Sequence, residues 1–330
     1  MQKINVGNSD LQISRIVFGA WAIGGWLWGG NDDKDALEAI HASLDHGITS
    51  IDTAPAYGFG HSEQLVAKAL RGKSRDKVEI LTKFGLRWDT TKGLLHFKTQ
   101  ANDGSPVDMM KYAGKDGIRK EIEDSLRRLD TDYIDLYQIH WPDPTTPISE
   151  TMEALLRLKE EGKIREVGVC NYSAGEMKEA EKTLSLASNQ VPYSMVLRDI
   201  EQEVVPYVLE NGKGILAYSP LQRGLLTGKI KDGFVFGKGD HRPGTKYFQE
   251  PNLGNTHAFL EKIKPIASAH QASLAQLVIQ WTLCQPGITA ALVGARNARQ
   301  VIQNAGAMEV SLAKEELALI NHELSLLKIV

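Results

Sequence analysis

Short apolar runs rich in β-branched residues alternate with amphipathic segments along most of the chain, and this alternation limits the possible folds more than any other feature. The runs end near Gly19, Asp52, Lys83, His140, Cys170, Gln190, Tyr218 and Val293. Between them, apolar residues at three- and four-residue steps predict helices. The clearest of these are Asp33–Asp45, Ser62–Arg71, Lys115–Arg128, Ile148–Glu161, Ala174–Thr183 and Glu201–Asn211. Eight strands separated by helices close a barrel, so we expect an α/β fold, a (β/α)8 TIM barrel.

Three segments depart from this alternation. Residues 4–14 alternate about a turn, which predicts a β-hairpin that caps the bottom of the barrel. Residues 87–114 form a long polar stretch with several glycines, and connections of this length are mostly lids or disordered segments. Residues Lys314–Leu327 predict an extra C-terminal helix. Because no repeat, low-complexity tract or linker divides the chain, we expect one domain over residues 1–330.

Charge and cysteine content argue against several classes of protein. The net charge of −3 and the pI near 6.3 disfavour a nucleic-acid or anionic-membrane surface. No apolar run reaches the roughly 18 residues of a membrane span, and the N-terminus has no signal-peptide pattern. The histidines show no metal-site spacing, so no metal is expected. Of the two cysteines, Cys170 is expected to pack and Cys284 to lie in the core. These features predict a cytoplasmic protein.

Four side chains that exchange or hold protons stand at the carboxyl ends of three consecutive predicted strands: Asp52, Tyr57, Lys83 and His140. In parallel α/β sheets this edge is where ligands bind. A tyrosine is a poor acid near neutrality, but a neighbouring ammonium such as Lys83 lowers the phenol pKa. Asp52 would hold Lys83, and His140 would donate to a carbonyl oxygen. The set predicts proton transfer to a carbonyl, with hydride supplied by a nicotinamide.

The motifs around these residues resemble those of the aldo-keto reductase family over essentially the whole chain. They are ITSIDTAPAYGFGHSE, LTKFG, YQIHWPD and VGVCNYS, in the family's order. The segment GAWAIGGWLWGG resembles a bacterial branch with glyceraldehyde-reducing and inositol-related members. The resemblance implies a catalytic tetrad of Asp52, Tyr57, Lys83 and His140, with Tyr57 as general acid. It also implies a monomer or weak homo-oligomer.

The resemblance further implies a site for NADPH, with NADH as the weaker alternative. Asn171 and Gln190 match the residues that hold the nicotinamide carboxamide, and Tyr218 matches the aromatic that stacks on the ring. Arg296 is the expected partner of the phosphate on the ribose, since guanidinium groups bind phosphate in a bidentate manner. The other implied positions are Gly19, Ala20, Trp21, Asp52, Cys170, Ser219, Pro220, Leu221, Gly224, Lys229, Gly294, Gln300 and Asn304.

The substrate is expected to be a small carbonyl compound or a sugar or polyol. Trp21 and Trp88, with Tyr57 and His140, are expected to line its pocket. Residues 22–32, 87–114 and 232–254 are the loops that would select it. Two other functions fit the same residues. One is a barrel aldolase that uses Lys83 as a Schiff-base amine. The other is a regulatory subunit that binds the cofactor as a redox sensor.

Overall fold

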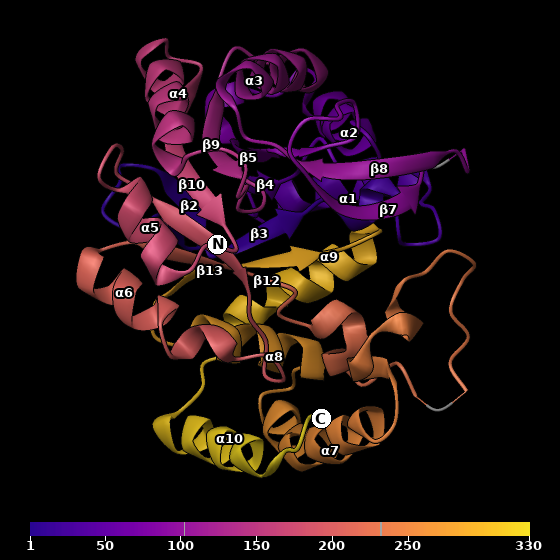
Figure 1. Ribbon diagram of the computed structural model, residues 1–330. Coiled ribbons are helices and arrows are strands. Elements are labelled where there is room, and N and C mark those ends of the chain that lie inside the picture. Colours follow the sequence, from indigo (N-terminus) through magenta and orange to yellow (C-terminus); the bar gives the residue numbers. More distant parts are fainter. Residues whose placement is uncertain (102, 232) are drawn as a thin grey trace.

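A computed structural model describes residues 1–101, 103–231 and 233–330, and it confirms the predicted barrel (Figure 1). Within the described residues, eight parallel strands close in the order β10–β11–β12–β13–β3–β4–β5–β9. Their bounds are β3 Ile16–Gly19, β4 Ser50–Asp52, β5 Glu79–Phe84, β9 Ile134–Ile139, β10 Ile164–Cys170, β11 Ser188–Pro192, β12 Gly214–Tyr218 and β13 Ile288–Gly294. Each strand ends at or next to the predicted residue, except β11, which continues from Gln190 to Pro192.

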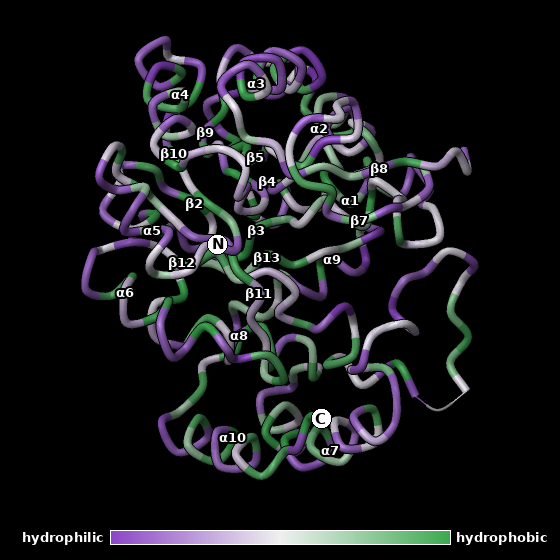
Figure 2. Tube along the Cα trace, viewed as in Figure 1, coloured by the Kyte–Doolittle hydropathy of each residue, from purple (hydrophilic) through white to green (hydrophobic). Residues whose placement is uncertain are grey.

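Helices surround the barrel and bury their apolar faces against it, so that apolar residues gather in the interior (Figure 2). Their bounds are α1 Asp33–Asp45, α2 His61–Leu70, α3 Lys115–Leu129, α4 Ile148–Glu160, α5 Ala174–Ala180, α6 Val204–Asn211, α7 Asn252–Ala269, α8 Leu274–Leu283, α9 Ala298–Ala305 and α10 Lys314–Leu326. The predicted C-terminal helix is thus confirmed as α10, and it lies beside α7 (Figure 1). Helix α5 ends at Ala180, short of the expected Thr183, and its C-cap residue Glu181 accepts a hydrogen bond from the Tyr207 hydroxyl.

The predicted hairpin is also present. Strands β1 (Lys3–Asn5) and β2 (Gln12–Ser14) pair antiparallel. Residues of this segment, including Val6 and Ile13, bury their side chains against Leu81 and Leu136 in the barrel interior. The hairpin therefore closes the amino-terminal end of the barrel and leaves the carboxyl end open for ligands.

Within residues 87–114, for which the sequence suggested a lid or a disordered segment, the described residues are ordered and contribute His96 and Phe97 to the lining of the cavity at this end of the barrel. The segment forms an antiparallel sheet in the order β6–β8–β7, with bounds β6 Leu86–Arg87, β7 Leu94–Gln100 and β8 Pro106–Lys111. Phe97 and Met109 pack on Trp26, and the Trp26 indole N–H donates to Thr99 Oγ1 at 3.3 Å. Apolar and polar residues alternate along these strands, but the polar composition of the whole segment hid this pattern from the sequence analysis. The apolar side of the sheet is covered by Trp26, which is distant in the sequence. Asn102 and Asp232, which belong to the predicted selection loops, lie outside the described residues.

The prediction for Cys284 was wrong as well. It is exposed, because it stands at the C-cap of α8, where the helix ends and the chain turns outward. The apolar run that surrounds it in the sequence ends at buried Leu283. No helix in the described ranges is long and apolar enough to cross a membrane.

A buried ion pair ties α2 and α3 to the barrel. The Glu63 carboxylate, which is fully buried, accepts from Arg128 Nε at 2.6 Å and from Thr82 Oγ1 of β5 at 2.7 Å. Removing the arginine would leave a buried carboxylate without its counter-charge, which is strongly destabilising.

We predict that Arg128→Met lowers the free energy of unfolding by about 3 kcal/mol, measured by urea denaturation. The matched control is Arg127→Met, which removes the same charge from an exposed pair with Asp124 and should cost less than about 1 kcal/mol. Equal losses in the two variants would contradict the role assigned to the buried pair.

Candidate active site

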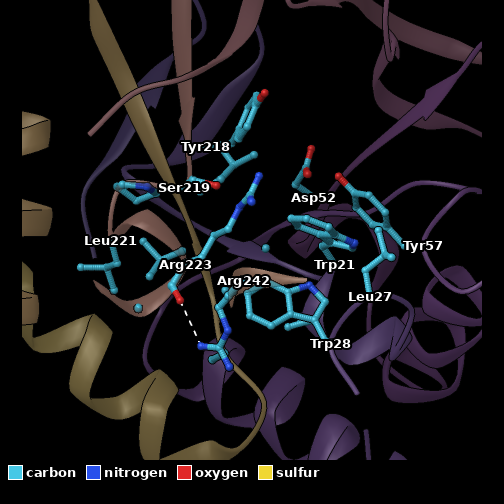
Figure 3. A pocket seen from close by; sticks show the side chains of 18 of the residues that line it. Trp21, Leu27, Trp28, Asp52, Tyr57, Tyr218, Ser219, Leu221, Arg223 and Arg242 are labelled. Carbon is cyan, nitrogen blue, oxygen red and sulfur yellow. Dashed lines mark hydrogen bonds between the residues drawn. The ribbon is translucent and has the colours of Figure 1, made fainter. Parts of the chain in front are cut away.

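The four predicted catalytic side chains stand at one rim of the barrel. Asp52 is the last residue of β4, Lys83 lies at the end of β5, and His140 follows β9. Tyr57 lies in the turn between β4 and α2, where its ring faces the cavity near Trp21 (Figure 3). The parallel register of β4, β5 and β9 aligns their ends, which brings residues from distant parts of the chain to one place.

A buried ion pair joins Asp52 and Lys83. The Lys83 ammonium donates to Asp52 Oδ2 at 2.6 Å and to the Thr53 carbonyl at 2.9 Å, and the two side chains are 1% and 3% exposed. Burial alone would lower the pKa of Lys83, but the charges of Asp52 and Tyr57 outweigh it and raise the pKa above its usual value. Lys83 is therefore a permanent cation at neutral pH.

Two glutamine amides extend this pair across the barrel. Gln190 Nε2 donates to Asp52 Oδ1 at 2.8 Å, and Gln138 Nε2 lies 3.4 Å from the same oxygen. Gln190 was expected to hold a nicotinamide, whereas here its amide group contacts Asp52. Gln138 was missed by the sequence reasoning. The signal was its place two residues before His140, since alternate residues of a strand face the same side.

Tyr57 keeps its proton in this environment. Burial raises the pKa of Tyr57 to about 12, although the Lys83 ammonium, 4.9 Å from the ring centroid, pulls it down. The expectation that Lys83 lowers the tyrosine pKa was therefore right for the lysine's contribution but wrong for the net shift. The His140 ring lies 5.7 Å from the Tyr57 ring at 81°. Burial, with the Lys83 charge, lowers the pKa of His140 well below its usual value, so the imidazole is neutral.

A cavity of about 660 Å³ extends from Tyr57 to the amino-terminal end of α9. Most of the predicted site residues line it: Gly19, Trp21, Asp52, Tyr57, His140, Cys170, Asn171, Gln190, Tyr218, Ser219, Pro220, Leu221, Gly224, Lys229, Gly294, Arg296, Gln300 and Asn304. Lys83 and Ala20 lie behind this wall, fully buried. Trp88 does not line the cavity but packs on Phe59. Other aromatic residues line the cavity instead: Trp26, Trp28, His96, Phe97, Trp141 and His241.

The middle of the cavity presents an aromatic ring held by an amide. The Tyr218 hydroxyl donates to Asn171 Oδ1 at 2.9 Å, and Asn171 Nδ2 donates to the His140 carbonyl at 3.0 Å. Asn171 adopts a left-handed backbone conformation, with φ of 60°, which turns its side chain to the rim. Burial raises the pKa of the neighbouring Cys170 thiol, which favours packing over nucleophilic chemistry.

The far end of the cavity is cationic. Arg296 Nη2 donates to the carbonyls of Trp28 and Gly30, which ties α9 to the loop after β3. Its Nε is buried and has no partner among the described residues. Gln300 Oε1 accepts from the Arg296 backbone N–H at 2.8 Å. Among the described residues, no cluster of histidine, cysteine and acidic side chains could hold a metal ion.

The pKa of His140 predicts how stability depends on pH. Below about pH 6.5 the unfolded chain binds a proton at this histidine that the folded chain does not, so the free energy of unfolding falls as the pH is lowered. We predict that His140→Gln reduces this loss by up to about 1 kcal/mol per pH unit between pH 6.5 and 5, measured by urea denaturation. His322→Gln, at an exposed histidine, is the control and should behave as the parent. A His140→Gln variant with the parent's pH dependence would refute the assignment.

Comparison with known proteins identifies the family. The sequence pattern of the aldo/keto reductase family matches residues 15–323. The chain is 40% identical to the aldo-keto reductase YhdN of Bacillus subtilis over 91% of this chain and 87% of the relative. It is 36% identical to the NADH-specific methylglyoxal reductase of Escherichia coli over 97% of both chains. The structure of glycerol dehydrogenase AKR11B4 from Gluconobacter oxydans superposes with a TM-score of 0.88, at 38% identity over 98% of this chain and 95% of that one. The chain therefore belongs to the aldo/keto reductase family, oxidoreductases that act on carbonyl groups.

Proposed function

We propose that this protein is an NADPH-dependent reductase of aldehydes or ketones, with Tyr57 as the proton donor. One observation supports this most strongly. A protonated phenol, a neutral imidazole and a buried Lys83–Asp52 pair meet at one end of a cavity of about 660 Å³. A donor with a high pKa suits an alkoxide, because the alkoxide is the stronger base and takes the proton.

The described residues fit a nicotinamide dinucleotide. Tyr218 and Asn171 offer a ring face and an amide near Tyr57, and the loop from Ser219 to Gly224 follows. The unpartnered Nε of Arg296 offers a donor at the far end. When bound, such a cofactor supplies hydride to the carbonyl carbon.

The protein's own residues would then manage the proton and the position of the substrate. His140 would donate a hydrogen bond to the carbonyl oxygen and hold it near the Tyr57 hydroxyl. Tyr57 would release its proton to the developing alkoxide. Lys83 would stabilise the resulting phenolate, since an ammonium close to the ring favours the charged form, and Asp52 would keep Lys83 in place.

The aldolase alternative is not favoured. A Schiff-base amine must be neutral to attack a carbonyl. Lys83 is held as an ammonium by Asp52 at 2.6 Å, and its pKa is raised. It also lies behind the cavity wall.

The names of two relatives and the lining of the cavity indicate the substrate class. The E. coli relative is named for methylglyoxal and the Gluconobacter relative for glycerol, which suggests a small polar carbonyl or polyol. The cavity near Tyr57 is walled by aromatic rings such as Trp26, Phe97 and Trp141, which suit the apolar face of a small molecule. A panel of aldehydes, ketones and sugars, followed by NADPH consumption, would identify the preferred substrate.

We predict that Tyr57→Phe lowers kcat by about 10²–10⁴-fold, because the phenol acts mainly in the transition state. The dissociation constant for NADPH, measured by fluorescence titration, should stay within about twofold of the parent. Tyr112→Phe, at a half-buried tyrosine after β8 that lies outside the cavity lining, is the control and should retain activity. Full activity in Tyr57→Phe would disprove its role as the acid.

We also predict that Arg296→Met raises KM for NADPH by about tenfold or more while changing KM for NADH little, because only NADPH carries a phosphate on the ribose. Steady-state kinetics with both cofactors measures this difference. Equal efficiency of the parent enzyme with NADH and NADPH would exclude the proposed preference, and would match the cofactor named for the E. coli relative.

A further inference from the structure

The β6–β8 sheet gives the cavity one polar side chain that has no role in the reaction as proposed above. Leu86, His96 and Phe97 of this sheet line the cavity, and His96 is the polar one of the three. Its ring lies 4.9 Å from the ring of Trp141, the residue that follows His140. A charge on His96 would also disfavour a charge on His140, so the two imidazoles lie at the same end of the cavity.

A β-bulge aims His96 into the cavity. In β7, Leu95 pairs with Met110 and Phe97 with Met109, so that His96 is an extra residue with no partner opposite it in β8. Consecutive residues of a regular strand face opposite sides, and half-buried and exposed residues alternate in this way further along β7. The bulge breaks the alternation and places His96 on the same side as Phe97. Bulges re-aim side chains in this manner beside active sites.

The His96 ring has unused hydrogen-bonding capacity. Among the described residues, none hydrogen-bonds to its ring nitrogens, whereas most other histidine rings of the chain bond a carbonyl or a carboxylate. Burial, with the charge of Lys111, lowers the pKa of His96, so the ring is neutral at neutral pH. A neutral imidazole offers one N–H donor and one acceptor nitrogen. A hydroxyl group, which both donates and accepts, complements this pair.

The neighbouring rings of the wall cannot do the same. Trp26, Phe97 and Trp141 line this part of the cavity, and an indole is a donor only. The Trp26 N–H already donates to Thr99 Oγ1 at 3.3 Å. A hydroxyl group that enters this aromatic region therefore finds its donor and its acceptor together at His96.

We propose that His96 is a specificity-determining residue that hydrogen-bonds a hydroxyl group which the substrate carries beyond its reacting carbonyl. The role of the carbonyl rests on the proposed function. With this residue in place, a hydroxylated aldehyde is preferred over the unsubstituted aldehyde of the same length, because the latter leaves the imidazole unpaired when it displaces water.

The test compares DL-glyceraldehyde with propionaldehyde, which share one carbon chain and differ only in hydroxyl groups. His96→Leu removes both hydrogen-bonding atoms of the ring, and His96→Gln keeps a donor and an acceptor. We expect the ratio of kcat/KM for glyceraldehyde to kcat/KM for propionaldehyde to fall about tenfold in His96→Leu. The value for propionaldehyde should stay within about twofold of the parent, and His96→Gln should recover part of the ratio.

Lys98→Leu is the control from the same strand, because Lys98 is exposed and lies outside the cavity lining. It should keep the parent's ratio. An unchanged ratio in His96→Leu, or an equal loss for both aldehydes, overturns the proposal, since a purely structural role would affect the two substrates alike. Thermal unfolding verifies that the variants are folded.

A measurement without turnover separates this inference from the proposed function. In protein labelled with ¹⁵N-histidine, the His96 ring resonances are identified by their absence from His96→Gln. They should shift on titration with glycerol but not with 1-propanol, in the presence or absence of NADP⁺. A parent that reduces neither aldehyde but shows this shift refutes the proposed function and retains the role of His96. A parent that reduces neither aldehyde and shows no shift refutes both.

Discussion

The ion pair between Lys83 and Asp52 is the interaction on which the rest of the site depends. Two opposite charges almost fully removed from water are tolerated only when geometry and additional hydrogen bonds compensate their desolvation. Here the Thr53 carbonyl and the amides of Gln138 and Gln190 provide those bonds. Together with Asp52 and Lys83, the side chains of this network come from four strands, β4, β5, β9 and β11. The pair therefore requires the closed barrel, and it places a permanent cation beneath Tyr57.

Burial and charge act against each other at this rim. Desolvation keeps the Tyr57 proton in place and the His140 ring neutral, while the Lys83 ammonium favours the phenolate. A phenol in such surroundings stays protonated until a strong base develops beside it.

The cavity acquires its other residues from segments that do not belong to the barrel. The β7–β8 hairpin brings His96 and Phe97, and the loop after β12 brings Arg223 and His241. The last of these reaches across to the loop after β3, where His241 Nδ1 contacts the Leu27 carbonyl at 2.6 Å. Contacts between loops far apart in the chain thus decide the shape of the cavity, while the strands decide its chemistry.

The sequence by itself determined the barrel, the hairpin cap, the C-terminal helix and the residues at the strand ends, because these depend on local periodicity and on motifs read within a few residues. It also predicted that the Asp52 carboxylate holds the Lys83 ammonium. It did not determine the net pKa of Tyr57, since desolvation depends on how many distant groups bury the ring. Nor did it predict the β7–β8 hairpin, the displaced position of Trp88 or the exposure of Cys284. Only the tertiary structure decided these, because each depends on which distant surface is present to cover an apolar side chain.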